Sequence, residues 1–377
     1  MALNPSGAIS LGGAITGQSV NLELSKAATA LISLNDTDLR TLFGVASGQI
    51  SLSQGYGQSS GASHGYFLGT VTASPTQGGE INRYTFATNA VNQTGLRLSP
   101  GAAKGVDAGG VNTPAKAYFA RGNSGTPNPA GAVANNQGSQ IDGIVFSSQT
   151  YFDSAAELVQ PRFNINVNVQ SETRGYFGGG SISPFPTQYP QVDGIVFATD
   201  SAIDVAAGLP EGSNVSRQHV QSTTRGYFAG AISSPSRFQS TGIGKIDFAT
   251  EGIAFTGANL VQARLSMSGV HSPTRGYFGG GNYPPSAPAQ QTQIDGITFA
   301  TETQYDAAAS LTVANSGKIS MVQGGYGIVG YALPGGFTSV DKFTFATETN
   351  SDIGAAAGAI AYPSGVSNNS GTQNNSI

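Results

Sequence analysis

Arg275-Gly-Tyr-Phe278 is the clearest copy of a short stretch that recurs along this chain of 377 residues. The other copies begin at His64, Lys116, Arg174, Arg225 and Gly324, the last in the degenerate form Gly-Gly-Tyr-Gly. Their tyrosines are Tyr66, Tyr118, Tyr176, Tyr227, Tyr277 and Tyr326, which follow one another at intervals of 49 to 58 residues. Self-similarity at this period is typical of the blades of a β-propeller.

Each repeat also contains a segment in which large apolar residues alternate with small or polar ones. Two copies are Val192-Asp-Gly-Ile-Val-Phe-Ala-Thr199 and Ile294-Asp-Gly-Ile-Thr-Phe-Ala-Thr301. Such alternation indicates a half-buried strand. A third segment is rich in small residues, as in Ala307-Ala-Ala-Ser-Leu311. With connections rich in Gly, Ser and Pro, these segments predict four short strands per repeat.

Six repeats of four strands predict a six-bladed β-propeller over residues 58–377. A lone sheet of this kind buries one face at most, so each blade needs neighbours and the ring needs closing. The C-terminal stretch Tyr362–Gly371 resembles Met267–Pro273, which precedes a Tyr-Phe strand. We therefore expect the C-terminal stretch to complete the first blade.

Residues 1–57 have a different pattern and are interpreted as a separate N-terminal domain. Ser19–Ser25 and Ala30–Leu34 are predicted to be strands. Asn35–Gly44 has helix signals at both ends, because Asn35 can cap the first turn and Gly44 can end the helix in a left-handed conformation. The expectation is a mostly β protein whose propeller follows a small β-rich module with one short helix.

Composition excludes several classes of protein. The chain has 53 glycines and only 10% charged residues, which argues against helical bundles and coiled coils. Its formal net charge of −4 provides no basic patch, so nucleic acid is not expected as a partner. No apolar run reaches the length of a membrane span, so membrane insertion is not expected. With no cysteine, disulfides, thiolate metal sites and cysteine nucleophiles are absent.

Residues that could carry chemistry mostly repeat from blade to blade. Asp142, Asp193, Asp295 and Asp341 share one repeat position, and Arg174, Arg225 and Arg275 share another. A catalytic site is unique in a chain, so repeated residues are interpreted as parts of the sheet, with each Arg paired to a carboxylate or carbonyl within it. His64, His219 and His271 show no metal-ligand spacing. We expect no catalytic residue, cofactor or metal, and a protein that is not an enzyme.

Two parts of the sequence resemble known families. The segments 7–13, 19–24, 32–35, 39–44 and 47–52 resemble, in their order, the N-terminal attachment module of virion proteins of tailed bacteriophages. The glycine-aromatic repeats with Phe-Ala-Thr segments resemble the Kelch-like propellers that follow such modules, as in cyanophages. The chain departs from ordinary Kelch repeats in having no tryptophan.

The resemblance implies a structural protein of the bacteriophage virion, located in the tail or on the outer surface of the particle. Its preferred interpretation is a tail fibre or receptor-binding protein that docks through its N-terminus and takes part in host attachment. A head or tail decoration protein without host contact is the alternative, and a polysaccharide-acting enzyme a weaker one. The implied partners are other virion proteins and a host surface glycan or protein, with a homotrimer as the common assembly.

Loops that do not repeat are the places to look for recognition. Four aromatic residues lie in the loops that follow the Tyr-Phe strands: Phe185, Tyr189, Phe238 and Tyr283. Aromatic rings beside Pro, Ser, Asn and Gln on exposed loops can stack on the apolar face of a sugar and bind its hydroxyls. These four residues are the candidate ligand-binding residues, with ordinary exposed loops or contacts to another subunit as the alternatives.

Overall fold

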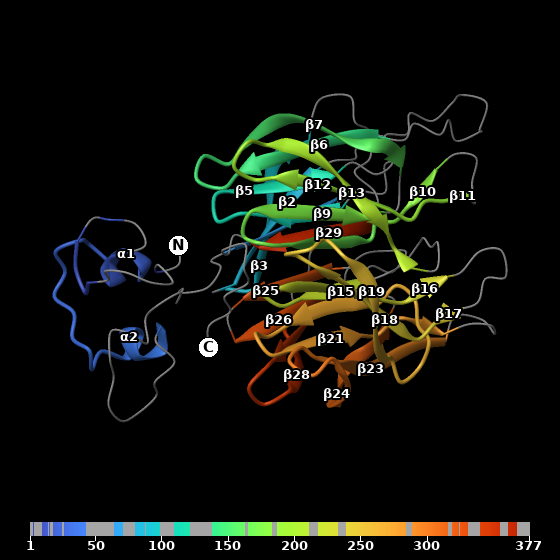
Figure 1. The fold of residues 1–377 in the computed structure, drawn as a ribbon. Helices are drawn as coiled ribbons and strands as arrows, with labels where there is room; N and C mark the ends of the chain where they lie inside the picture. Colours follow the sequence, from blue (N-terminus) through green and yellow to red (C-terminus); the bar gives the residue numbers. More distant parts are fainter. Residues whose placement is uncertain are drawn as a thin grey trace.

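The structure is a computed structural model of the whole chain. It describes Leu3, Ile15 and residues 10–13, 18–24, 26–42, 64–70, 80–86, 88–98, 109–120, 138–162, 165–182, 187–210, 218–232, 239–283, 289–315, 319–323, 325–330, 340–354 and 361–367. The described strands form a six-bladed β-propeller, as the sequence predicts (Figure 1).

The first three blades are antiparallel sheets of four strands. Blade 1 contains β29 (Ala361–Ser367), β1 (His64–Thr70), β2 (Glu80–Thr85) and β3 (Ala90–Arg97). Blade 2 contains β4 (Gly109–Asn112), β5 (Lys116–Ala120), β6 (Gly138–Val145) and β7 (Thr150–Arg162). Blade 3 contains β8 (Val167–Gln170), β9 (Arg174–Gly178), β12 (Gln191–Val196) and β13 (Ser201–Gly208). The second strand of each of these three blades carries the Tyr-Phe pair.

The other three blades repeat this order. Blade 4 contains β14 (Gln218–Gln221), β15 (Arg225–Ala229), β18 (Gly242–Asp247) and β19 (Ile253–Asn259). Blade 5 contains β20 (Ser268–His271), β21 (Arg275–Gly279), β23 (Ala289–Thr298) and β24 (Thr303–Asn315). Blade 6 contains β25 (Ile319–Gln323), β26 (Tyr326–Gly330), β27 (Val340–Thr344) and β28 (Thr349–Asp352).

The ring is closed by the C-terminal strand, which confirms the expectation from the sequence. β29 pairs antiparallel with β1, so that Gly65 lies opposite Ser367 and Phe67 opposite Gly365. The innermost strands β29, β4, β8, β14, β20 and β25 contact one another in that circular order. Because the first blade combines strands from both ends of the propeller, its pairing holds the ring together.

Strand register corrects the position of the sixth repeat. In blade 5 Tyr277 lies opposite Gly296, but in blade 6 the residue at the equivalent position opposite Lys342 is Ile328. Tyr326 pairs with Thr344 and so takes the place of Arg275, which pairs with Thr298. The predicted alignment of Tyr326 with the other tyrosines is therefore wrong by two residues. It aligned residues of the same type, whereas strand register aligns Ile328 with those tyrosines.

Packing between blades requires glycine at the second residue of the second strand in blades 3 to 6. A Cβ atom on Gly276 would lie 2.3 Å from Cγ2 of Val220 in the innermost strand of blade 4. A Cβ on Gly327 would lie 2.5 Å from Cβ of Val270 in blade 5. No side chain fits at these distances, so the repeated glycine lets one blade approach the next.

The N-terminal residues fold differently from the prediction. The described residues contain two short helices, α1 (Val20–Glu23) and α2 (Thr37–Leu42). The helix predicted over Asn35–Gly44 is confirmed in α2, but the strands predicted over Ser19–Ser25 and Ala30–Leu34 are wrong. A short alternating run also puts residues four apart on one helix face, and here Val20 packs with Leu3 and Leu39 while Leu24 packs against their cluster. The predicted domain boundary near residue 57 lies outside the described residues.

None of the described helices is long and apolar enough to cross a membrane.

Candidate functional site

The two faces of the propeller differ in what they carry. In blades 3 and 4 the connection between the second and third strands extends into a small ribbon, formed by β10 (Ser181–Ile182) with β11 (Thr187–Gln188) and by β16 (Ala231–Ile232) with β17 (Gln239–Ser240). In blade 5, β22 (Asn282–Tyr283) pairs with the start of β23 in the same way. These three ribbons define the ribbon face, where β10, β11, β16 and β17 project to the right in Figure 1.

Two of the four candidate ligand-binding residues lie in or next to these ribbons. Tyr283 lies in β22, and Tyr189 directly follows β11. Phe185 and Phe238 lie outside the described residues. The antiparallel order of the strands therefore places Tyr189 and Tyr283 on one face of the ring, in blades 3 and 5, with blade 4 between them.

Tyr189 also has a contact within the propeller. Its ring centroid lies 5.5 Å from the Arg162 guanidinium carbon, and its backbone N–H donates to the Gly180 carbonyl over 3.0 Å. Arg162 is completely buried and forms an ion pair with Asp193. Tyr189 thus covers a buried ion pair, a role that its position in a loop did not indicate.

The buried ion pair has a second copy two blades further on. Arg264, which follows the last strand of blade 4, forms an ion pair with Asp295 in β23, and neither side chain is exposed. Arg264 also donates to the carbonyls of Gly280 and Gln293, each over 2.7 Å. Burial raises the pKa of the Asp295 carboxyl, and the charge of Arg264 opposes that rise. The sequence signal for these arginines was available, since Leu-Val-Gln-x-Arg occurs at 158–162 and again at 260–264.

The repeated acids are parts of the sheets, as predicted. Asp142 and Asp341 are buried like Asp193 and Asp295. Asp341 accepts a hydrogen bond of 2.9 Å from the backbone N–H of Thr312, which belongs to the preceding blade. In blades 3, 5 and 6 the acid at the shared position therefore links the blade to the one before it.

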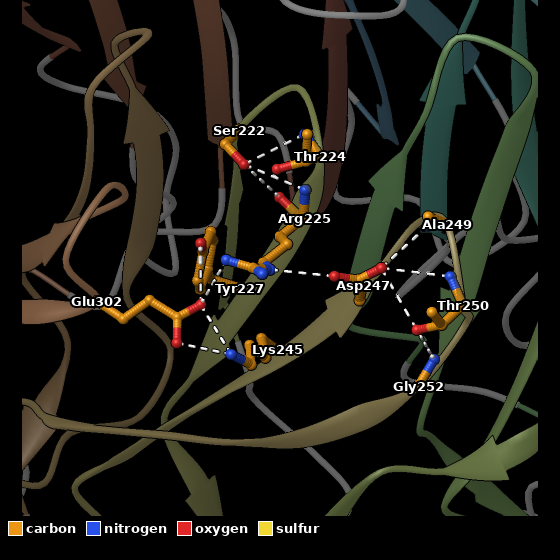
Figure 2. A network of polar contacts seen from close by, with 10 residues as sticks. All are labelled: Ser222, Thr224, Arg225, Tyr227, Lys245, Asp247, Ala249, Thr250, Gly252 and Glu302. Atoms are coloured by element: carbon orange, nitrogen blue, oxygen red, sulfur yellow. Dashed lines mark hydrogen bonds and ion pairs between the residues drawn. The ribbon is translucent and has the colours of Figure 1, made fainter.

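The opposite face carries a second set of contacts between blades, shown for blades 4 and 5 in Figure 2. Glu302, in the turn between the third and fourth strands of blade 5, receives three donors from blade 4. Arg225 Nη1 lies 3.1 Å and the Tyr227 hydroxyl 3.5 Å from Glu302 Oε1, while Lys245 Nζ lies 2.6 Å from Oε2. Asp247 holds Arg225 from the other side, with 3.2 Å between its Oδ2 and Nε.

We call this arrangement the inter-blade clasp. In a clasp, a turn residue of one blade is bound by two residues of the preceding blade, namely a Tyr and the Arg or Lys two positions before that Tyr. The clasp face is the face that carries it. Charged clasps join Lys116 and Tyr118 to Asp200, Arg174 and Tyr176 to Glu251, Arg225 and Tyr227 to Glu302, and Arg275 and Tyr277 to Glu348. The prediction that these arginines pair within their own sheet is wrong for their Glu partners, which lie in the next blade.

Every turn residue at the clasp position has a left-handed backbone. The residues are Asn89, Gln149, Asp200, Glu251, Glu302 and Glu348, with φ between 51° and 55°. Glycine would adopt this conformation at lower cost, yet each described blade has a side chain here that can reach a donor. The hydrogen bonds and ion pairs of the clasp side chains therefore stabilise the fold by more than the left-handed backbone conformation costs.

Burial and the acids of the clasps keep the tyrosines protonated. Burial, together with Glu251, raises the pKa of Tyr176 to about 12. The hydroxyl therefore acts as a neutral donor. Each clasp tyrosine also stacks on a Phe of the next blade, as for Tyr176 and Phe248 with ring centroids 5.6 Å apart and Tyr227 and Phe299 at 5.1 Å. These ring pairs pack neighbouring blades in a chain without tryptophan.

The three histidines lie in different blades, as their spacing predicts. Burial lowers the pKa of His219 to about 4, and its Nδ1 lies 3.2 Å from the Asn166 carbonyl oxygen. Burial, together with Arg83, lowers the pKa of His64. Among the residues that the structure describes, no group of three or more His, Cys, Asp or Glu side chains could hold a metal ion.

The sequence matches no protein-family model and no curated protein. The assignment of function therefore rests on the two faces. On the clasp face the charged side chains of the clasps pair with one another, whereas the ribbons differ in sequence from blade to blade.

Proposed function

We propose that this chain is a virion structural protein of a tailed bacteriophage, in which a Kelch-like propeller presents its ribbon face to the host surface. The observation that carries the proposal is the asymmetry of the ring. Three consecutive blades extend ribbons from one face, and these ribbons are not copies of one another in length and sequence. The clasps repeat on the other face. Repeated residues build the scaffold, and unlike residues on a common rigid face are suited to recognition.

The path of the chain supports a direction of attachment. β1 begins at His64 and β29 ends at Ser367, and strand pairing places Gly65 opposite Ser367. Both strand ends lie on the clasp face, because the third-to-fourth-strand turns lie there too. The N-terminal residues 1–57, which resemble a virion-attachment module, are thus joined to the ring on the face opposite the ribbons. Docking by these residues would leave the ribbons directed outward, and trimerisation would multiply the number of ribbons.

The chemistry of the ribbons favours a neutral glycan as the ligand. The stretches 181–190, 231–240 and 282–290 are rich in Ser, Pro and Gln and contain one charged residue, Arg237. Hydroxyl and amide groups can bind sugar hydroxyls, and aromatic residues such as Tyr283 can stack on the pyranose ring. Binding of this kind needs no catalytic group.

The experiment that tests the proposal has two parts. Imaging of virions that carry a label on this chain should place it at the tail or outer surface of the particle. Particles with Tyr283→Ala should adsorb to host cells at least several-fold more slowly, while a matched change on the clasp face, Thr301→Ala, should have no effect. Normal adsorption of folded Tyr283→Ala particles, together with a label on the head, would favour a decoration protein instead.

A further inference from the structure

The six junctions between neighbouring blades are not equivalent. Four of them, from blade 2 to blade 6, carry a charged clasp with a Tyr donor. The junction from blade 1 to blade 2 has an uncharged version, in which Gln149 Nε2 donates to the Tyr66 hydroxyl over 3.1 Å. The junction from blade 6 to blade 1 differs from all of these.

At that junction the clasp tyrosine is missing. Ile328 occupies the position of the clasp tyrosine and has no hydroxyl group. The turn residue that a clasp would hold is Asn89 of blade 1. Its Oδ1 instead accepts a 2.7 Å hydrogen bond from Tyr84, a residue of the same blade.

The contact that the buried repeated acid makes with the preceding blade in blades 3, 5 and 6 is also missing at this junction. Asn82 lies opposite Phe67 in blade 1, the position that Asp295 holds opposite Phe278 in blade 5. The Asn82 side chain is buried, and neither its Oδ1 nor its Nδ2 has a hydrogen-bond partner. The chain between β28 and β29 contains no Arg or Lys that could take the role of Arg264. A buried amide without a partner destabilises the folded state around it.

We propose that the propeller has a built-in opening seam between blades 6 and 1, and that β29 is the strap that closes it. Among the described residues, this junction lacks the clasp tyrosine and the buried acid that stabilise other junctions, so closure of the ring depends more strongly here on the backbone pairing of β29 with β1. Release of β29 exposes the hydrogen-bonding edge of β1 while the clasped blades 2 to 6 stay folded. The free energy needed to reach this open form is therefore lower than the free energy of global unfolding.

Amide hydrogen exchange on the full chain tests the seam directly. The amides of β29 should exchange at least tenfold faster than those of β14, the innermost strand of blade 4. Blade 4 is the matched control because charged clasps join it to both neighbouring blades. Equal exchange rates for β29 and β14 would overturn the proposal.

A disulfide provides a reversible lock for the strap. The chain has no cysteine, and Leu68 and Ser364 lie directly opposite each other in β1 and β29. In Leu68→Cys, Ser364→Cys protein, oxidation should slow exchange in β29 and β1 at least tenfold, and reduction should restore it, with exchange in blade 4 unchanged. Exchange in β29 that does not differ between the oxidised and reduced forms would show that the seam does not open there.

Introducing a clasp between blades 6 and 1 distinguishes an effect on the seam from an effect on the overall stability of the protein. Tyr326→Arg, Ile328→Tyr and Asn89→Glu together recreate at this junction the residues of the blade 5 to blade 6 clasp, and should slow exchange in β29. If the triple variant does not fold, Asn82→Leu, which removes the unpartnered amide, should slow exchange in β29 by itself. Loss of an existing clasp in Glu302→Gln should lower the melting temperature and leave local exchange in β29 unchanged. A folded seam variant with wild-type exchange in β29 would contradict the proposal.

Discussion

The hydroxyl of Tyr277 lies 2.9 Å from Oε1 of Glu348, although the two residues belong to different blades and are 71 positions apart in the chain. Arg275 Nη1 lies 2.6 Å from the same oxygen. This relationship recurs around the clasp face, so each blade is held by residues of the blade before it. The stability of the ring therefore depends on side chains at the turns as well as on the apolar surfaces between sheets.

Removal of one clasp acid should destabilise the propeller without unfolding it. Glu302→Ala removes the carboxylate that accepts from three donors and keeps a non-glycine residue in the left-handed conformation. We therefore expect a loss of about 1–3 kcal/mol in the free energy of unfolding. Glu302→Gly loses the same donors but relieves the backbone at φ 51°, and should be less destabilised by roughly 1 kcal/mol. Urea denaturation of the two variants measures the difference. An alanine variant as stable as the glycine variant would show that the turn is not strained.

Breaking the buried ion pair should cost more than losing a clasp. Asp295→Ala leaves the Arg264 guanidinium buried without its carboxylate, and we expect a loss of about 3–5 kcal/mol. The double variant Arg264→Met, Asp295→Leu removes both charges and should be much closer to wild type in stability. Denaturant unfolding of the single and double variants gives the coupling energy. A double variant as unstable as the single one would argue against a buried charge as the cause.

A bulge in the fourth strand allows a matched test of backbone strain. Ala155 in β7 has φ 57°, whereas the equivalent residue in β19 is Gly257 with φ 90°. Ala155→Gly should stabilise the protein by roughly 0.5–1 kcal/mol, because relief of strain exceeds the added entropy of the unfolded chain. Gly257→Ala should destabilise it by about 1–2 kcal/mol, since nothing lies within 4 Å of the added Cβ and only the backbone is affected. Thermal unfolding of both variants measures the two signs, and the same sign for both would refute this account.

His219 should make stability depend on pH on the acidic side of neutrality. Its pKa is lowered to about 4 in the folded protein, so between about pH 6.5 and pH 4 the unfolded chain binds a proton that the folded chain does not. The contribution of the neutral imidazole is therefore present above about pH 6.5 and is lost as the pH falls toward 4. In His219→Gln the stability should change less than in wild type between pH 7 and pH 4.5. Parallel pH profiles for the two proteins would show that His219 titrates normally.

Sequence by itself determined the number of blades and the closure of the ring. Both follow from local patterns, because each repeat carries its own alternating segments and Tyr362–Gly371 repeats the pattern of a first strand. The repeated acids could also be identified as scaffold, since residues at one repeat position share one environment. In the N-terminal part this local reasoning failed at Ser19–Ser25, because a run of seven residues fits the period of a strand and that of a helix equally well.

Tertiary structure alone decided which residues meet. Arg225 could have paired within its own sheet by sequence, and Asp247 does so, but Glu302 reaches it only because blade 5 packs against blade 4. Register likewise gave Ile328, and not Tyr326, the position of the clasp tyrosine. The clasp contacts made by the second strand of a blade join residues more than 70 positions apart, and nothing in the local sequence indicates that these residues are close in space. The seam at blade 1 becomes visible only when these contacts are compared from junction to junction.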